Sequence, residues 1–210
     1  MAKKEKVKKP FYKRVWFWVL VVIIAIAVGG GASGGKSSKT STTSNSSSVS
    51  STTKLPSGAT TEQKNALRQA ESYSNMMYMS KTGIYDQLTS DAGDKFSAED
   101  AQWAVGNLKV DYNKNALAKA KQYVSQQHLS KAGVYDQLSS DSGEKFTADE
   151  AQYAVDNLKY DYKKSALAKA KTYQTQMNMS SDAIYDQLTS DAGEKFTADE
   201  AQYAVDHLND

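Results

Sequence analysis

Residues 184–205 read IYDQLTSDAGEKFTADEAQYAV. Nearly the same string stands at 134–155 as VYDQLSSDSGEKFTADEAQYAV and at 84–105 as IYDQLTSDAGDKFSAEDAQWAV. An Ala-Leu pair precedes each copy, at 66–67, 116–117 and 166–167. A fixed repeat of this length is typical of one supersecondary unit that is used several times. The sequence therefore predicts three tandem modules over 62–110, 111–160 and 161–210, and we expect a row of similar surfaces instead of one active site.

Each module is predicted to be three short helices. In the first module, a helix is expected from about Glu62 to Tyr78, because apolar side chains recur there at helical spacing. That stripe comprises Ala66, Leu67, Ala70, Tyr73 and Met77. A second helix is expected to begin at Ser80, Ser130 or Ser180, whose hydroxyl can cap free backbone N–H groups. Strand patterns are absent beyond the N-terminal segment, so the predicted fold class is all-α.

A turn precedes the third helix of each module. It holds Gly93, Gly143 or Gly193, and we expect these glycines to adopt the left-handed conformation that commonly ends a helix. Capping boxes then predict where the third helices begin, at Thr147 and Thr197, with a weaker version at Ser97. The preceding phenylalanines 96, 146 and 196 are expected to pack on the alanines 101, 151 and 201 as hydrophobic staples.

The N-terminal segment predicts a membrane anchor. Residues 1–14 are basic, and 15–32 form an uncharged run about long enough to cross a bilayer. The side chains expected in or beside the bilayer are Trp16, Trp18, Leu20, Ile23, Ile24 and Ile26. Because positive charge stays inside, we expect a cytoplasmic N-terminus and extracellular modules. A cleaved signal peptide is the alternative reading of this segment.

Residues 33–61 are rich in Ser, Thr and Gly and predict a flexible linker, because such a segment buries too little apolar surface to order itself. Beyond residue 58 the chain holds 16 Lys/Arg and 23 Asp/Glu, a net charge of −7. An acidic surface of this kind repels polyphosphate. The third helix of the second module also begins with Asp149 and Glu150, so the sequence argues against a nucleic-acid partner.

The strings SKTGIYDQLTSDAGDKFSAEDAQWAV at 80–105 and ALAKAKQY at 116–123 resemble the Ltp family of host-cell surface-exposed lipoproteins with helix-turn-helix repeats. The resemblance covers about residues 63–210 and implies a small all-helical repeat domain outside the membrane of a Gram-positive cell. It also implies superinfection exclusion, in which prophage-encoded members stop an incoming phage from delivering its DNA without blocking attachment. This chain has no cysteine to carry a lipid, so we expect the transmembrane helix to replace that anchor.

No catalytic or metal-binding pattern is legible in the modules. His128 and His207 stand where the other copies have Tyr78 and Asn178, or Asn107 and Asn157, whereas a catalytic role repeated by module would keep its residue. The acidic residues around each turn lack the alternating spacing of a calcium loop. We therefore expect a binding protein with no enzymatic activity and no cofactor.

Trp103, Tyr153 and Tyr203 are the candidate partner-binding residues. At helical spacing they lie nearly opposite the alanine face of the third helix, and exposed aromatic side chains contribute much of the energy of protein interfaces. The competing interpretation is that they pack on a first helix. The leading functional hypothesis is contact with a phage tail protein or ejected protein at the membrane. The alternative is a chromosomal envelope protein that binds wall polymer or another surface protein.

Overall fold

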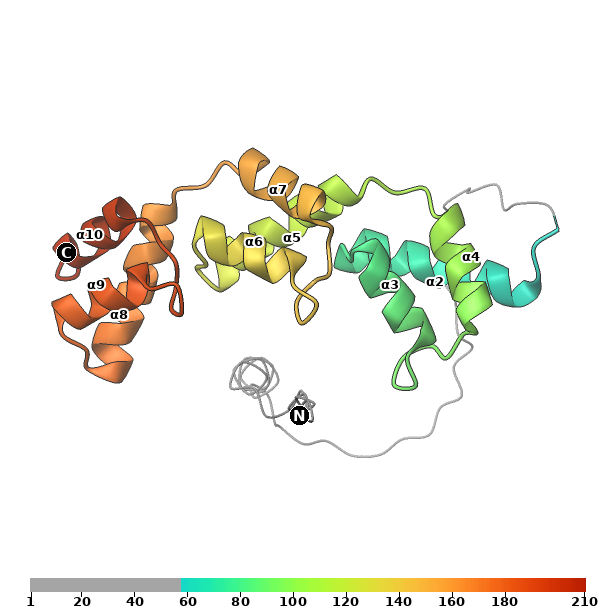
Figure 1. Ribbon diagram of the computed structural model, residues 1–210, viewed down its shortest axis with the longest axis horizontal. Helices are drawn as coiled ribbons and strands as arrows, with labels where there is room; N and C mark the ends of the chain where they lie inside the picture. The colour runs from blue at the N-terminus through green and yellow to red at the C-terminus, as the bar shows by residue number, and fades with distance from the viewer. Residues whose placement is uncertain (1–57) are drawn as a thin grey trace, which may run out of the picture. The chain divides into compact units, whose positions relative to one another are not determined.

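The computed structural model describes residues 58–210, which form nine α-helices and no strand (Figure 1). The all-α prediction is therefore confirmed for this part of the chain. The helices are α2 (Thr61–Met77), α3 (Lys81–Thr89), α4 (Ala98–Asn107), α5 (Tyr112–Gln126), α6 (Lys131–Ser139), α7 (Ala148–Asn157), α8 (Tyr162–Met177), α9 (Ser181–Thr189) and α10 (Ala198–Asp206). The predicted anchor, and the linker up to residue 57, lie outside the described residues. No helix between 58 and 210 combines the length and the hydropathy that a bilayer crossing requires.

Each repeat has its own hydrophobic core, built from three consecutive helices. In the second repeat Val134 and Leu138 of α6 are buried against Ala151 and Ala154 of α7 and Ala120 of α5. Equivalent clusters fill the first and third repeats. Alanine at these positions lets the first and third helices of a repeat approach closely, so that α2 packs on α4, α5 on α7 and α8 on α10.

The third helices begin at the residues that the capping pattern indicates. Thr147 and Thr197 are the N-caps of α7 and α10, and each forms both hydrogen bonds of a capping box with Glu150 or Glu200. Ser97 caps α4 through the backbone N–H of Asp100 without the reciprocal bond. These caps satisfy backbone donors that the first turn of a helix leaves free.

The apolar stripe of the first helix differs from its prediction at one end. Ala66, Leu67 and Ala70 are buried, but Met77 is 50% exposed, and Ser74 occupies the buried position in the last turns of α2. Ser74 is buried because it faces a polar side chain of the next repeat, the amide of Asn115. That contact is a tertiary feature, and helical periodicity alone does not contain it.

The predicted reason for the turn glycines is wrong. Among the described glycines only Gly58 has a positive φ, and the left-handed residues of the three turns are Lys95, Lys145 and Lys195. Glycine is required at 93, 143 and 193 because there is no room for a side chain. A Cβ built there would lie 2.1–2.2 Å from the backbone oxygen of Gln87, Gln137 or Gln187.

Candidate binding groove

An acidic side chain fixes each turn to the first helix of its own repeat. In the second repeat, Glu144 accepts hydrogen bonds from the phenol of Tyr123 and from Lys119, whose Nζ lies 3.1 Å from Glu144 Oε1. Glu194 is held in the same way by Tyr173 and Lys169 in the third repeat. In the first repeat Tyr73 donates to Asp94 at 2.8 Å.

The pKa of each of these three phenols lies above its ordinary value, chiefly because of burial and further because of the bonded carboxylate. For Tyr73 the hydrogen bond from Gln69 acts in the opposite direction. The phenols therefore stay neutral donors under physiological conditions. Each turn has a defined position on its repeat as a result.

The turn of one repeat then docks on the second helix of the repeat before it. Ser80 at the start of α3 donates to the backbone oxygen of Glu144 at 2.5 Å, and Ser130 donates to that of Glu194 at 2.6 Å. Beside these bonds Lys145 pairs with Asp86, and Lys195 Nζ lies 2.6 Å from Asp136 Oδ2. The first two repeats and the last two therefore share one mode of docking on this side.

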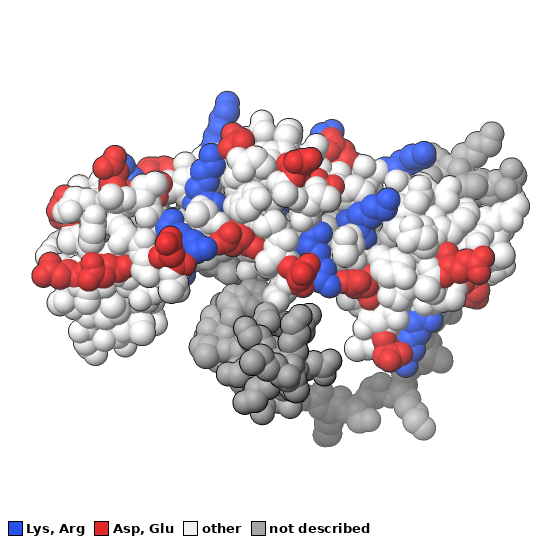
Figure 2. Space-filling model, in the orientation of Figure 1, with Lys and Arg blue, Asp and Glu red and all other residues white. Residues whose placement is uncertain are grey.

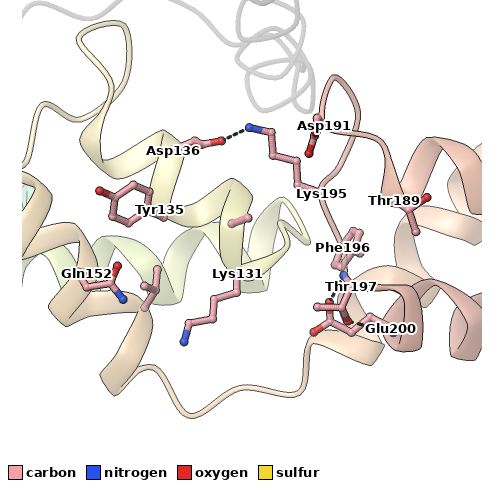
Figure 3. A pocket seen from close by; sticks show the side chains of 12 residues that line it. Lys131, Tyr135, Asp136, Gln152, Thr189, Asp191, Lys195, Phe196, Thr197 and Glu200 are labelled. Atoms are coloured by element: carbon pink, nitrogen blue, oxygen red, sulfur yellow. Dashed lines mark hydrogen bonds and ion pairs between the residues drawn. The ribbon is translucent and has the colours of Figure 1, made fainter.

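A groove lies where the third repeat docks on the second. It runs between α6 and α7, has a volume of about 620 Å³, and is bordered on one side by the turn that precedes α10 (Figure 3). The lining residues from the second repeat are Lys131, Ala132, Tyr135, Asp136, Gln152 and Val155. Those from the third repeat are Thr189, Asp191, Lys195, Phe196, Thr197 and Glu200. The site thus requires two adjacent repeats.

Equivalent residues form smaller grooves in the other repeats. The first repeat has a cavity of about 220 Å³ lined by Lys81, Thr82, Tyr85, Gln102 and Val105. The third has one of about 320 Å³ lined by Ser181, Asp182, Tyr185, Asp186, Gln202 and Val205. We call the three together the repeat grooves. Only the groove of the second repeat includes residues of a neighbouring repeat. At the start of the second helix, Lys81 and Thr82 are replaced by Lys131 and Ala132 and then by Ser181 and Asp182.

The groove of the second repeat combines an apolar wall with charged edges. Val155 and Phe196 are buried, whereas Lys131 and Asp136 are exposed at the rim. Lys131 Nζ lies 2.9 Å from Asp156 Oδ1. A hydrogen bond from Gln152, with the contact to Lys131, holds the pKa of Asp156 below its ordinary value. Pairing with Asp136 raises the pKa of Lys195. Two ion pairs therefore lie beside the apolar wall of the groove.

Acidic and basic side chains lie interspersed on the face drawn in Figure 2. The net negative charge of residues 59–210 is therefore not gathered into one large patch on this face.

The three predicted partner-binding aromatics lie outside the repeat grooves and have different surroundings. Trp103 is partly buried and packs on the core of the first repeat. Tyr203 stacks on His207 with ring centroids 4.0 Å apart, and Lys163 lies over its ring. Tyr153 is 38% exposed. The structure does not gather these residues into one site.

Sequence reasoning missed the groove residues, although a signal for them exists. The repeated YDQL string contains Tyr85, Tyr135 and Tyr185. The repeated strings at 84–105, 134–155 and 184–205 end at Val105, Val155 and Val205. A helical stripe of this kind predicts core packing, and the open space beside it depends on how α6, α7 and the next turn meet. Within residues 58–210, no group of acidic or histidine side chains could hold a metal ion.

These features define a class: an all-helical tandem-repeat protein whose repeats dock through their turns and present equivalent grooves. The sequence model of the family described as host cell surface-exposed lipoprotein, Lipoprotein_Ltp, matches residues 61–108, 111–158 and 161–208. The chain belongs to this family. It contains no cysteine, although the family description speaks of lipoproteins.

One solved structure is similar to part of the chain. It is described as Ltp, a superinfection exclusion protein from the Streptococcus thermophilus temperate phage TP-J34. The two sequences are 47% identical over a match that covers 48% of this chain and 100% of the other, with a TM-score of 0.43. No curated protein matches the chain.

Proposed function

We propose that this protein is a membrane-anchored binding protein of the cell surface that excludes superinfecting phages by blocking entry of their DNA. The observation that carries the proposal is family membership over all three repeats. The 47% sequence identity to a phage superinfection exclusion protein supports it. The role is binding and not catalysis, and the partner is a phage tail protein or ejected protein that reaches the membrane.

The proposed topology is a single span with a cytoplasmic N-terminus and extracellular repeats. Its support is the sequence pattern: basic residues before position 15, an uncharged run to position 32, and a Ser/Thr/Gly-rich segment after it. A linker of about 30 residues has an average span of roughly 30 Å, so the repeats would remain near the outer leaflet. That location suits an encounter with phage components at the membrane.

We place the contact in the groove between the second and third repeats. The groove is the largest of the three repeat grooves, and it offers apolar contact area next to paired charges. Interfaces gain most of their energy from apolar anchors that fill such pockets. An amphipathic segment with basic residues fits best, because the repeats carry net negative charge. Tyr153 on the other side of α7 is the second candidate contact, supported by its exposure.

The test is expression of the full chain in a phage-sensitive Gram-positive host that is then challenged with a panel of phages. Plaque formation, adsorption and entry of phage DNA are scored together. Normal adsorption with lost DNA entry is the expected result. Unchanged DNA entry throughout the panel would contradict the proposal and favour an envelope protein that binds wall polymer or another surface protein.

Variants then locate the contact. Ala132→Arg adds a bulky cation at an exposed position inside the groove, so protection should be lost at an unchanged surface level. Gln126→Arg makes a similar change at an exposed position on α5 outside the repeat grooves, and it should protect like the wild type. Tyr153→Ala tests the second candidate. Full protection by Ala132→Arg together with lost protection by Tyr153→Ala would move the site to the outer face of α7.

A further inference from the structure

Within residues 58–210, the first and the third repeat each carry one uncovered half of the docking contact that joins neighbouring repeats. Ser80 and Ser130 are 1% exposed because the next turn covers them, whereas the equivalent Ser180 is exposed. Ser180 still caps α9 by accepting from the backbone N–H of Ala183. Within residues 58–210 its hydroxyl donates to no acceptor.

The acidic partner of the docking contact is also present and unused at this end. Asp186 of α9 is equivalent to Asp86 and Asp136, which pair with Lys145 and Lys195. Asp186 has no ion-pair partner among the described residues, and neighbouring Asp182 adds a second carboxylate to the same exposed face. The end of the third repeat therefore offers a hydroxyl donor and negative charge.

The first repeat offers the complementary half. Lys95 is exposed and unpaired within 58–210, and the backbone oxygen of Asp94 accepts no hydrogen bond there, whereas Glu144 and Glu194 each accept one from the preceding repeat. Phe146 and Phe196 are 3% and 4% exposed, but Phe96 is only partly buried. The turn before α4 thus has the groups of a docked turn, and no repeat among residues 58–210 covers it.

We propose that the third repeat of one molecule binds the first repeat of a second copy, head to tail. Ser180 donates to the backbone oxygen of Asp94, and Asp186 pairs with Lys95, as the equivalent residues do inside the chain. Ala183 replaces the glycines 83 and 133, and a Cβ there is compatible, since it would meet the turn oxygen at 3.6–3.8 Å. A contact between two different surfaces leaves both ends of the pair open and extends to rows of molecules.

The alternative is that the end repeats are solvated caps, as in many repeat proteins. A cap replaces interface residues with polar ones, and positions 181 and 182 do change to Ser and Asp. The residues that make the docking contact do not change: serine, aspartate, lysine and phenylalanine all remain. Continuity with the two internal contacts and charge complementarity therefore favour a second copy. This inference does not depend on the proposed function.

Charge exchange between molecules tests the contact. Self-association of the full chain in mild detergent is followed by sedimentation velocity over a range of concentrations. Because the contact is small, we expect weak association that grows with concentration. Lys95→Glu and Asp186→Lys each place like charges opposite each other, and each should weaken self-association by about tenfold or more. Lys121→Glu, at an exposed position of α5, is the matched control and should associate like the wild type.

An equal mixture of the two charge variants gives the decisive result. Each molecule then meets opposite charge only on the other variant, so the mixture should associate more strongly than either variant alone. A wild-type chain that stays monomeric at every concentration would overturn the proposal and identify the end repeats as caps. Charge variants that associate as strongly as the wild type would also overturn it, because the contact would then lie elsewhere, for example in the apolar N-terminal run.

Discussion

The junction between the first and second repeats and the junction between the second and third share one side and differ on the other. On the shared side a serine binds a turn oxygen and a lysine pairs with an aspartate. On the other side of the first junction, Asn115 Nδ2 lies 2.9 Å from Ser74 Oγ and 3.0 Å from the backbone oxygen of Met79.

In the second junction Ser165 takes the place of Asn115, and Val124 takes that of Ser74. Tyr160 replaces Val110, and its phenol donates to the backbone oxygen of Val124 at 3.2 Å. At the second junction Tyr160 of the connecting segment thus donates the hydrogen bond to the preceding repeat that Asn115 of α5 donates at the first junction. Docking through the turn is therefore the same at both junctions, whereas the contacts between the first helices differ.

The largest effect should come from breaking a turn. Gly143→Ala places a Cβ 2.1 Å from the backbone oxygen of Gln137, and the turn that docks on the first repeat must move. We expect a loss of roughly 2–4 kcal/mol in the free energy of unfolding, measured by urea denaturation. Gly106→Ala is the matched control: a Cβ there meets nothing within 4 Å, so this helical position should gain up to about 1 kcal/mol. Equal results for both variants would contradict the steric reason for glycine.

Truncating the polar side chain between the first helices should destabilise the first junction more than the second. Asn115→Ala removes a buried amide and leaves the oxygens of Ser74 and Met79 without their donor, which costs about 1–3 kcal/mol. Ser165→Ala removes only a contact of 3.5 Å to Tyr160 and should cost less than about 1 kcal/mol. Thermal unfolding of both variants measures the difference. A loss at Ser165 as large as that at Asn115 would show that the two junctions are more alike than their hydrogen bonds indicate.

Removing the serine hydroxyl of the shared side should lower the free energy of unfolding equally at both junctions. The same change at Ser180 should lower it less. Ser80→Ala and Ser130→Ala each remove a helix cap and an inter-repeat hydrogen bond, which together cost roughly 1–2 kcal/mol. Ser180→Ala removes the cap alone and should cost about half as much. Urea denaturation in dilute solution, where molecules do not associate, measures these losses in the free energy of unfolding within one molecule. A loss at Ser180 equal to that at Ser80 would mean that the turn oxygen contributes nothing.

The smallest effect at neutral pH should come from the tyrosines that begin α5 and α8. Burial, followed by the negative charge of Glu150, raises the pKa of Tyr112 to about 12, and burial with Glu200 does the same for Tyr162. Because the folded pKa exceeds the ordinary value of 10, the contribution to stability is complete below pH 10. It is lost as the pH rises through about 12.

Tyr112→Phe should weaken this alkaline loss of stability. At pH 7 it should leave stability unchanged or raise it slightly, because the hydroxyl is buried without a hydrogen-bond partner. Thermal unfolding between pH 8 and pH 12 measures both effects, with Tyr162→Phe as the equivalent change at the second junction. A clear loss at pH 7 would contradict the unpaired state of the hydroxyl.

The sequence alone determined what depends on neighbours along the chain. The repeat length, the all-α class and the helix starts at Thr147 and Thr197 follow from periodicity and capping, which are local interactions. The resemblance to the Ltp family, carried by the strings around residues 80–105 and 116–123, is confirmed by the family match. The repeat grooves were not predicted, because their open volume is set by how packed helices meet and, in the groove of the second repeat, by a turn of the third repeat as well.

Only the tertiary structure decided the roles of several residues that the local pattern had explained differently. Gly143 is required by the nearness of a backbone oxygen and not by its own φ angle, and the left-handed residue of that turn is Lys145. Ser80 reads as a helix cap, and its second bond, to the turn of the next repeat, is invisible in the local pattern. The physical reason is the same in both cases: helix formation uses contacts within about four residues, whereas docking joins residues about sixty positions apart.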